Sequence, residues 1–262
     1  MSPSDADDST AAHALADDSL DPADWIAFRA DAHRILDDVI DYVQGLRTRP
    51  VWRPMPLAVR SSFDAPVPRA PGSLLDVHRR VLSQVVPYVA GNSHPGFMAW
   101  VHGGGNIFGV MGELVAAGLN ANLGGRDHAP IEIERQVIRW VAELFGFPEK
   151  AGGILVTGTS IANFIGVLSA RSHALGPAVR GKGIGGAALV AYTSRAAHGC
   201  IARAMDMAGL GVDALTLVDT DAEHRLDVEQ LRAAIARDRA AGRTPFLVVG
   251  TAGTVDTGAI DD

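Results

Sequence analysis

Short apolar runs and segments with helical spacing alternate along the second half of the chain. The apolar runs predict buried strands, and they cover residues 154–156, 188–192, 214–218 and 246–250. Helical spacing follows the first three runs, from residue 161 onward and over residues 197–208 and 228–241. Strands that alternate with helices are typical of a mostly parallel sheet covered on both faces. We therefore expect an α/β fold that binds its ligand at the carboxyl ends of the strands.

The first half of the chain is predicted to be mainly helical. Asp21-Pro22 is a favourable helix start, and a long amphipathic helix follows it, with apolar residues at Trp25, Phe28, Leu36, Val39, Ile40, Val43 and Leu46. Six prolines between residues 47 and 71 predict an extended strap, after which Ser73 caps a helix through Val86. Two more helices are expected at Ile107–Leu119 and from Pro130 to Phe145.

The long first helix lies outside the α/β pattern, so its apolar face needs something to pack against. A second subunit is the favoured partner, and the core of a monomer is the alternative. Residues 1–20, which precede the helix, are rich in Asp, Ser and Ala, and we expect them to form a disordered tail.

Composition narrows the class of protein. Of the 262 residues, 47% are hydrophobic and 20% charged, which suits a soluble domain with a sizeable core. A net charge of −7 argues against a nucleic-acid partner. No apolar run has the length of a membrane span, and the acidic N-terminus does not resemble a signal peptide. The single cysteine, Cys200, excludes an intramolecular disulfide and suits the reducing cytoplasm, where we expect the protein to act.

The stretch Gly152–Asn163 has a pattern suited to ligand binding. A predicted strand ends at Val156, a turn of small residues follows, and the next helix starts with free N–H groups beside Thr159 and Ser160. Such a helix start is a site for phosphate, and an ordinary N-capped connection is the alternative. A P-loop is excluded because no lysine follows the glycines. The glycine-rich loop at 181–186 precedes a strand, whereas a dinucleotide fingerprint follows one, so we interpret it as a connector.

Two further groups follow predicted strands. His198 is expected to open the helix after residues 188–192, and Thr251–Thr254 form a glycine turn after residues 246–250. Parallel strands end at the same edge of a sheet, so we expect these groups to converge with the turn before Ser160. His198 and Cys200 would point away from each other on a helix, which argues against a Cys–His dyad.

The segment from His94 to Gly105 contains two histidines, a tryptophan and three successive glycines, and this composition indicates a surface that touches a ligand. His94 and His102 are candidate metal ligands. No carboxylate or cysteine lies at ligand spacing from them, however, and we expect no metal site.

Taken together, these segments resemble the group II pyridoxal-phosphate-dependent decarboxylases, the aromatic-amino-acid and glutamate decarboxylase group of the fold-type-I enzymes. The resemblance runs from about Trp25 to the last residue. It is carried by His94-Pro95 with Phe97 and Trp100, Pro130 with Glu132 and Glu134, Gly153–Asn163, Ala191–Ser194 with His198, and Thr251–Thr254. It implies a helical arm and strap at residues 21–105, followed at 106–262 by the first part of the cofactor-binding large domain.

The resemblance also implies roles for individual residues. Thr159 and Ser160 would hold the phosphate of pyridoxal 5′-phosphate, His198 would stack on its ring as the catalytic residue, and Thr251 would lie near the ring substituents. The expected substrate-binding residues are His94, Trp100, Asn120 and Asn122. Residues 120–123 fall where the partner subunit of a homodimer contributes to the pocket.

Two groups of the family's mechanism are not matched: the aspartate that keeps the pyridine nitrogen protonated and the Schiff-base lysine, which lie downstream of a stretch like 256–262. Lys150 and Lys182 are the only lysines, and both stand away from the predicted strand ends. We therefore interpret the sequence as the N-terminal part of a decarboxylase of an L-amino acid, with an aromatic amino acid as one candidate substrate. Another fold-type-I reaction (aldehyde synthesis, a lyase reaction or transamination) and a non-catalytic dimerising fragment are the alternatives.

Overall fold

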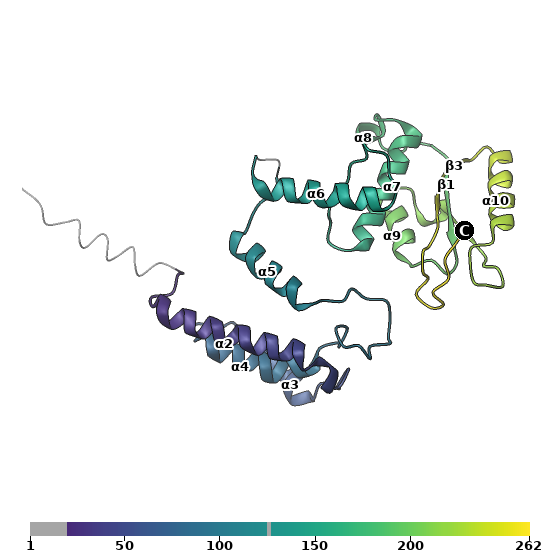
Figure 1. The fold of residues 1–262 in the computed structure, drawn as a ribbon. Coiled ribbons are helices and arrows are strands. Elements are labelled where there is room, and N and C mark those ends of the chain that lie inside the picture. The colour runs from purple at the N-terminus through teal and green to yellow at the C-terminus, as the bar shows by residue number, and fades with distance from the viewer. Residues whose placement is uncertain (1–19, 125–126) are drawn as a thin grey trace, which may run out of the picture. The chain divides into compact units, whose positions relative to one another are not determined.

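The computed structural model describes residues 20–124 and 127–262, so the predicted disordered tail lies outside the described residues except for Leu20. The chain divides into two compact units between Asn120 and Ala121. Figure 1 shows the helices of the first unit and the sheet with its helices in the second. Within the described ranges, no helix is both long and apolar enough to cross a membrane.

The first unit is built on α2 (Trp25–Gln44), which starts three residues later than Asp21-Pro22 would place it. The start is set by Asp24, whose side chain accepts hydrogen bonds from Ile26 N and Ala27 N at 2.8 and 3.0 Å. A side-chain oxygen in this position satisfies amides that have no partner inside the helix. The helix ends at a 3₁₀ turn, Leu46–Thr48.

The predicted strap contains a helix. Between Pro56 and Pro66 the chain forms α3 (Leu57–Ser61) and a 3₁₀ turn (Ser62–Asp64). The prediction of an irregular segment throughout was wrong because the residues between these two prolines include no further proline to block helical hydrogen bonds.

Two predicted helices of the first unit are confirmed. α4 (Leu74–Arg80) follows the cap Ser73 and continues as a π-helical turn (Val81–Val85) and a 3₁₀ turn (Val86–Tyr88). α4 packs against α2. α5 (Ile107–Leu119) has the predicted bounds.

The second unit contains a three-stranded parallel sheet in the order β2-β1-β3. Its strands are β1 (Leu189–Ser194), β2 (Leu215–Val218) and β3 (Thr244–Val249). Its helices are α6 (Ala129–Leu144), α7 (Thr159–Leu175), α8 (Val179–Lys182), α9 (Cys200–Met207) and α10 (Val228–Ala240), and a 3₁₀ turn (Val212–Ala214) precedes β2. The three predicted strands from residue 188 onward are thus confirmed, and the first residues of the expected connector at 181–186 belong to α8.

Alternate residues of β1 face opposite sides of the sheet. Ala191 belongs to a buried cluster with α7 and α9, which includes Val167 and Met205. Val190 and Tyr192 instead contact α10 at Ala234. Since side chains alternate along a strand, this pattern confirms a sheet that helices cover on both faces.

The predicted strand at 154–156 is absent. Residues 151–156 are irregular, and Ile154 and Leu155 are 62% and 59% exposed. The three-residue run pairs with no strand in the described part of the chain, and a strand needs a neighbour for its N–H and C=O groups. The segment lies against α6 instead: the amide of Leu155 donates to Glu134 Oε1 at 3.1 Å, and a Cβ on Gly153 would lie 2.9 Å from Ile138 Cγ2.

Tyr192 predicts a pH dependence of stability. Its buried hydroxyl donates to Asp238 Oδ2 at 2.8 Å, and burial, together with this carboxylate, raises the pKa of Tyr192 to about 12. Above pH 10 the unfolded chain releases a proton that the folded chain keeps, so the free energy of unfolding should fall by about 2 kcal/mol as the pH rises from 10 through 12. Urea denaturation should show this fall, and Tyr192→Phe should lack it. An equal fall in the variant would assign the effect to other groups.

Candidate cofactor-binding site

The start of α7 leaves two backbone donors free. Gly158, the N-cap residue, has φ +85° and ψ 151°. The amides of Ile161 and Ala162 donate to the Gly158 carbonyl at 3.2 and 3.3 Å, whereas no acceptor within the described residues is found for the amides of Thr159 and Ser160. Both residues are exposed, and no side chain caps the helix. N–H groups at a helix start point outward along the axis, so this turn offers two amides and two hydroxyls to an anion.

His198 lies in the turn between β1 and α9, not in the helix that it was expected to open. α9 starts at Cys200, whose amide donates to His198 Nδ1 at 3.2 Å, so the imidazole takes the place of a capping side chain. The residue is exposed, which leaves its ring accessible to a ligand. The prediction that His198 opens the helix was therefore wrong: α9 starts two residues after it, because a residue that caps a helix lies before its first turn.

A side-chain contact links this turn to α7. Asn163, in the first turns of α7, lies with its Nδ2 at 3.3 Å from the Sγ of the buried Cys200. α7 also packs against α9. Asn163 follows Ser160 by three residues, and Cys200 follows His198 by two, so the contact draws together the elements that carry the free amides and the imidazole.

Thr251 follows β3 at the same edge of the sheet. The hydroxyl of Thr193, near the end of β1, donates to the carbonyl of Val249 at 2.9 Å and ties the two strand ends together. The amide of Thr251 donates to Asp261 Oδ2 at 2.8 Å. The second unit therefore places Thr251 and the His198 turn at neighbouring carboxyl ends, as the sequence pattern predicted.

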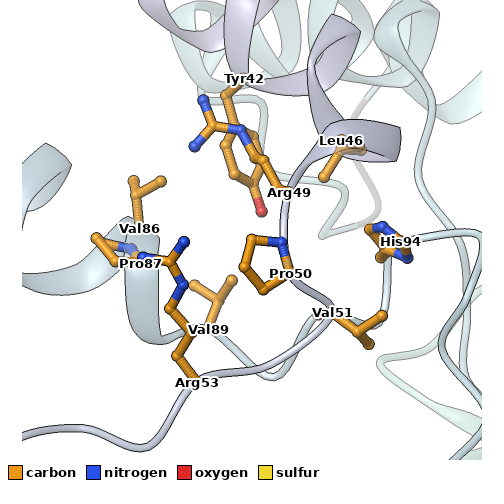
Figure 2. Close-up of a pocket in the computed structure, with 11 residues that line it drawn as sticks. Tyr42, Leu46, Arg49, Pro50, Val51, Arg53, Val86, Pro87, Val89 and His94 are labelled. Carbon is orange, nitrogen blue, oxygen red and sulfur yellow. The ribbon is translucent and has the colours of Figure 1, made fainter.

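His94 lines a pocket of the first unit together with Tyr42, Arg49 and Arg53 (Figure 2). Its Nδ1 accepts a hydrogen bond from Gly96 N at 2.8 Å, and its buried Nε2 has no hydrogen-bond partner in the described residues. Arg49 lies over the ring of Tyr42, 5.0 Å from the centroid. A role of His94 in substrate binding stays a prediction.

The other expected substrate-binding residues have local contacts of their own. Trp100 is 54% exposed and packs edge-on against Phe97, with ring centroids 5.2 Å apart. Asn120 caps α5 in the left-handed conformation, which asparagine tolerates better than most residues. Asn122 Oδ1 accepts from Gly124 N at 2.8 Å. Asn120 and Asn122 belong to different units, and their contribution to a pocket stays a prediction.

The second unit fits pyridoxal 5′-phosphate. A phosphate dianion matches the free amides and hydroxyls of Thr159 and Ser160 at the positive end of a 17-residue helix. A flat aromatic ring matches the exposed imidazole of His198. In the described residues, no group of three or more His, Cys, Asp or Glu side chains is arranged to hold a metal ion.

Sequence reasoning missed two carboxylates that support this site. Glu134 belongs to the motif on α6, but its bond to Leu155 N appears only once residues 151–156 are placed along that helix. Asp261 lies ten residues after Thr251, and no local pattern connects the two. A carboxylate after a glycine turn is too common a feature to identify such a partner.

Known proteins share this architecture. The aromatic-L-amino-acid decarboxylase of Bacillus atrophaeus is 29% identical over 238 residues, which cover 87% of this chain and 47% of that protein. The crystal structure of mouse CSAD superposes with a TM-score of 0.80 at 25% identity, covering 91% of this chain and 51% of the other. The 4-hydroxyphenylacetaldehyde synthase of Rhodiola rosea has a TM-score of 0.78 at 26% identity, with coverages of 92% and 53%.

The extent of the similarity defines the family. The chain spans about half the length of the curated relatives that it matches. The conserved domain of pyridoxal-dependent decarboxylases matches residues 56–262, which is most of the chain. The fold is that of the fold-type-I enzymes, and the cofactor of the family is pyridoxal 5′-phosphate. The protein belongs to the pyridoxal-dependent decarboxylase family.

Proposed function

We propose that this chain provides the phosphate and ring contacts for pyridoxal 5′-phosphate in an enzyme that decarboxylates an L-amino acid to the amine and carbon dioxide. The observation that carries the proposal is the start of α7, where the free amides of Thr159 and Ser160 lie on a helix joined to the His198 turn by the Asn163–Cys200 contact. Membership of the decarboxylase family supports the reaction class.

Each residue has a defined task. Thr159 and Ser160 donate amide and hydroxyl hydrogens to the phosphate, and the positive end of the α7 dipole adds to the attraction. The exposed ring of His198 would stack on the pyridine ring and orient it, and Thr251, which follows β3, would lie near the ring substituents. The bound cofactor supplies an electron sink for the pair released when the Cα–carboxylate bond breaks.

We propose an aromatic L-amino acid as the substrate and the cytoplasm as the compartment. The Bacillus atrophaeus relative acts on aromatic L-amino acids by its name, and Phe97 and Trp100 offer aromatic faces in a segment that the family places near the substrate. Aldehyde synthesis is the second candidate, because the Rhodiola rosea relative is an aldehyde synthase.

A homodimer is part of the proposal. α5 is apolar on most of its surface, yet none of its residues is buried within the first unit, and Phe108 is 84% exposed. α2 likewise leaves Trp25 61% exposed and buries none of its residues. Apolar helix faces of this extent mark an interface. Light scattering at micromolar concentration should give the mass of a dimer, and a monomer would refute this part.

Borohydride trapping tests the cofactor assignment. With pyridoxal 5′-phosphate and borohydride, this chain should give no site-specific adduct at Lys150 or Lys182. Lys182 ends α8, which follows α7, and the C-terminal end of α7 lies about 22 Å along the helix from Ser160. A polypeptide that continues past Asp262 with the family's lysine should give one adduct, at that lysine, located by peptide mass spectrometry.

The same longer polypeptide tests the reaction. It should release carbon dioxide from an aromatic L-amino acid and form the amine. Transamination alone would retain the cofactor and refute decarboxylation, whereas an adduct at Lys182 would refute the placement of the phosphate at α7.

A further inference from the structure

Asp261 joins two loops at the carboxyl edge of the sheet. Its Oδ2 accepts from the amide of Thr251 at 2.8 Å, and its Oδ1 accepts from the amide of Leu226 at 2.7 Å. Its own amide donates back to the Thr251 carbonyl at 3.0 Å. One carboxylate therefore fixes the backbone of Thr251 relative to the loop between β2 and α10.

The segment between Thr251 and Asp261 is closed on itself. Ala252 and Ile260 form an antiparallel bridge, and the amides of Gly253 and Thr254 donate to the Ala259 carbonyl at 3.1 and 2.9 Å. The paired residues Thr251 and Asp261 form the base of this loop. Because the loop is stabilised by its own hydrogen bonds, the pairing of Thr251 with Asp261 determines where Thr251 lies at the end of β3.

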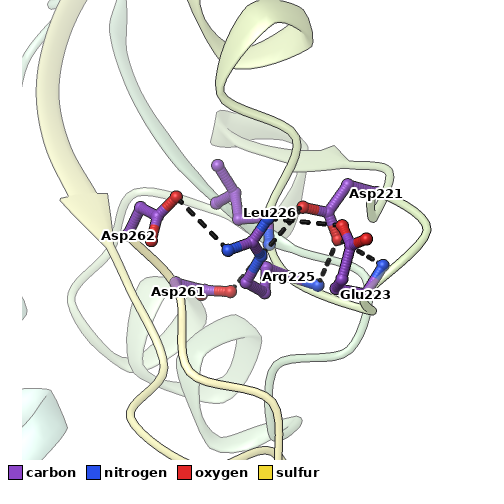
Figure 3. Close-up of polar contacts among 6 residues, drawn as sticks. All are labelled: Asp221, Glu223, Arg225, Leu226, Asp261 and Asp262. Atoms are coloured by element: carbon purple, nitrogen blue, oxygen red, sulfur yellow. Dashed lines mark hydrogen bonds and ion pairs between the residues drawn. The ribbon is translucent and has the colours of Figure 1, made fainter.

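The loop between β2 and α10, which Asp261 holds through the Leu226 amide, is itself stabilised by further contacts (Figure 3). Arg225, next to Leu226, donates from its amide to Asp221 Oδ1 at 2.9 Å and from Nε to Asp221 Oδ2 at 3.0 Å. The backbone N–H of Arg225 is the main cause that lowers the pKa of Asp221, and the guanidinium adds to it. Asp261 thus ties Thr251 to a turn with a fixed shape.

We infer that Asp261 is a positioning residue for the cofactor ring, acting through the backbone of Thr251. The inference rests on the proposed function for the role of Thr251. A carboxylate suits this task because each of its two oxygens accepts from a different amide, whereas an asparagine has one acceptor oxygen. Asp262 is the matched control: it is a neighbouring carboxylate that contacts the side chain of Arg225 at 3.6 Å.

Asp261→Asn and Asp262→Asn, each in the full 262-residue chain, test the inference. NMR should show hydrogen exchange at least about tenfold faster at the Thr251 or Leu226 amide in Asp261→Asn, since a bond to a charged acceptor is lost. The affinity for pyridoxamine 5′-phosphate, a probe that needs no lysine and is followed by its fluorescence, should fall about tenfold. Inorganic phosphate should shift the amide signals of Thr159 and Ser160 equally in both variants, and Asp262→Asn should match the unaltered chain throughout.

Each other outcome overturns a stated part of the inference. Unchanged exchange at both amides would refute the link that Asp261 makes between the Thr251 and Leu226 loops. Faster exchange with unchanged pyridoxamine 5′-phosphate affinity would refute the positioning role. The same conclusion would follow if Asp261→Asn weakened the binding of inorganic phosphate as much as that of pyridoxamine 5′-phosphate, because Asp261 would then stabilise the structure in general. If the unaltered chain binds no pyridoxamine 5′-phosphate, the proposed function fails and the positioning of the ring fails with it, a result distinct from a loss confined to Asp261→Asn.

Discussion

Gly158→Ala should weaken binding of pyridoxamine 5′-phosphate to this chain by about 10- to 100-fold while the parallel sheet stays folded. Gly158 has φ +85° and ψ 151°, a region that only glycine occupies without strain. A methyl group there meets no atom within 4 Å, so the effect comes from the backbone and not from a clash. Relief of a strain of about 1–3 kcal/mol requires the first peptides of α7 to rotate, which moves the amides of Thr159 and Ser160 away from the phosphate.

The same helix provides the control. Gly176, at its C-terminal end, has φ +76° and ψ 173°, and a methyl group there also meets open space. Gly176→Ala should therefore lower the free energy of unfolding by a similar amount and leave the affinity unchanged. Fluorescence titration and urea denaturation of both variants separate the two effects. An equal loss of affinity in both variants would show that the start of α7 is not the phosphate site.

The sequence pattern predicted most of the second unit. The three strands of the sheet and α10 follow from continuous apolar runs that alternate with helical spacing, because a buried parallel strand has apolar residues on both faces. The run at 154–156 has the same local composition, but no strand lies beside it in the part of the chain that the structure describes. Strand pairing is a long-range property, so three apolar residues cannot specify it.

The helix boundaries show a similar limit. α5 lies between Asn106 and Asn120, which cap its two ends, and its bounds were predicted correctly from apolar spacing. α2 and α9 start later than predicted because the capping side chains are those of Asp24 and His198. A histidine that caps through Nδ1 is not among the residues normally expected at a helix start.

The residues of the candidate site that lie in local turns were predicted from the sequence, whereas the contacts between these turns were not. Thr159 and Ser160 follow from a glycine turn before a helix, and His198 follows from its place after a strand. The contacts that join these parts, Asn163 with Cys200 and Asp261 with Thr251, link residues 37 and 10 positions apart. Such contacts depend on tertiary packing, which a local sequence pattern cannot predict.

His198→Ala should reduce turnover about 100-fold or more in the polypeptide that continues with the family's lysine, because a cofactor ring tilted out of position loses the alignment of the bond that breaks. The fold should survive, since His198 is exposed and the one hydrogen bond of its side chain in the described residues is that from Cys200 N. Circular dichroism and the urea midpoint check the fold, and amine formation measures turnover. His173→Ala, an exposed histidine in the last turn of α7, is the control and should retain full activity.

Two further substitutions separate the ring of His198 from its capping role. His198→Asn keeps a side-chain acceptor for the Cys200 amide but has no aromatic face, whereas His198→Phe keeps the face and has no acceptor. If stacking is the function, the Asn variant should be as slow as the Ala variant, and the Phe variant should keep most of the activity with a small loss of stability. The opposite order would show that the cap, by fixing the start of α9, matters more than the ring, and would remove His198 from the catalytic residues.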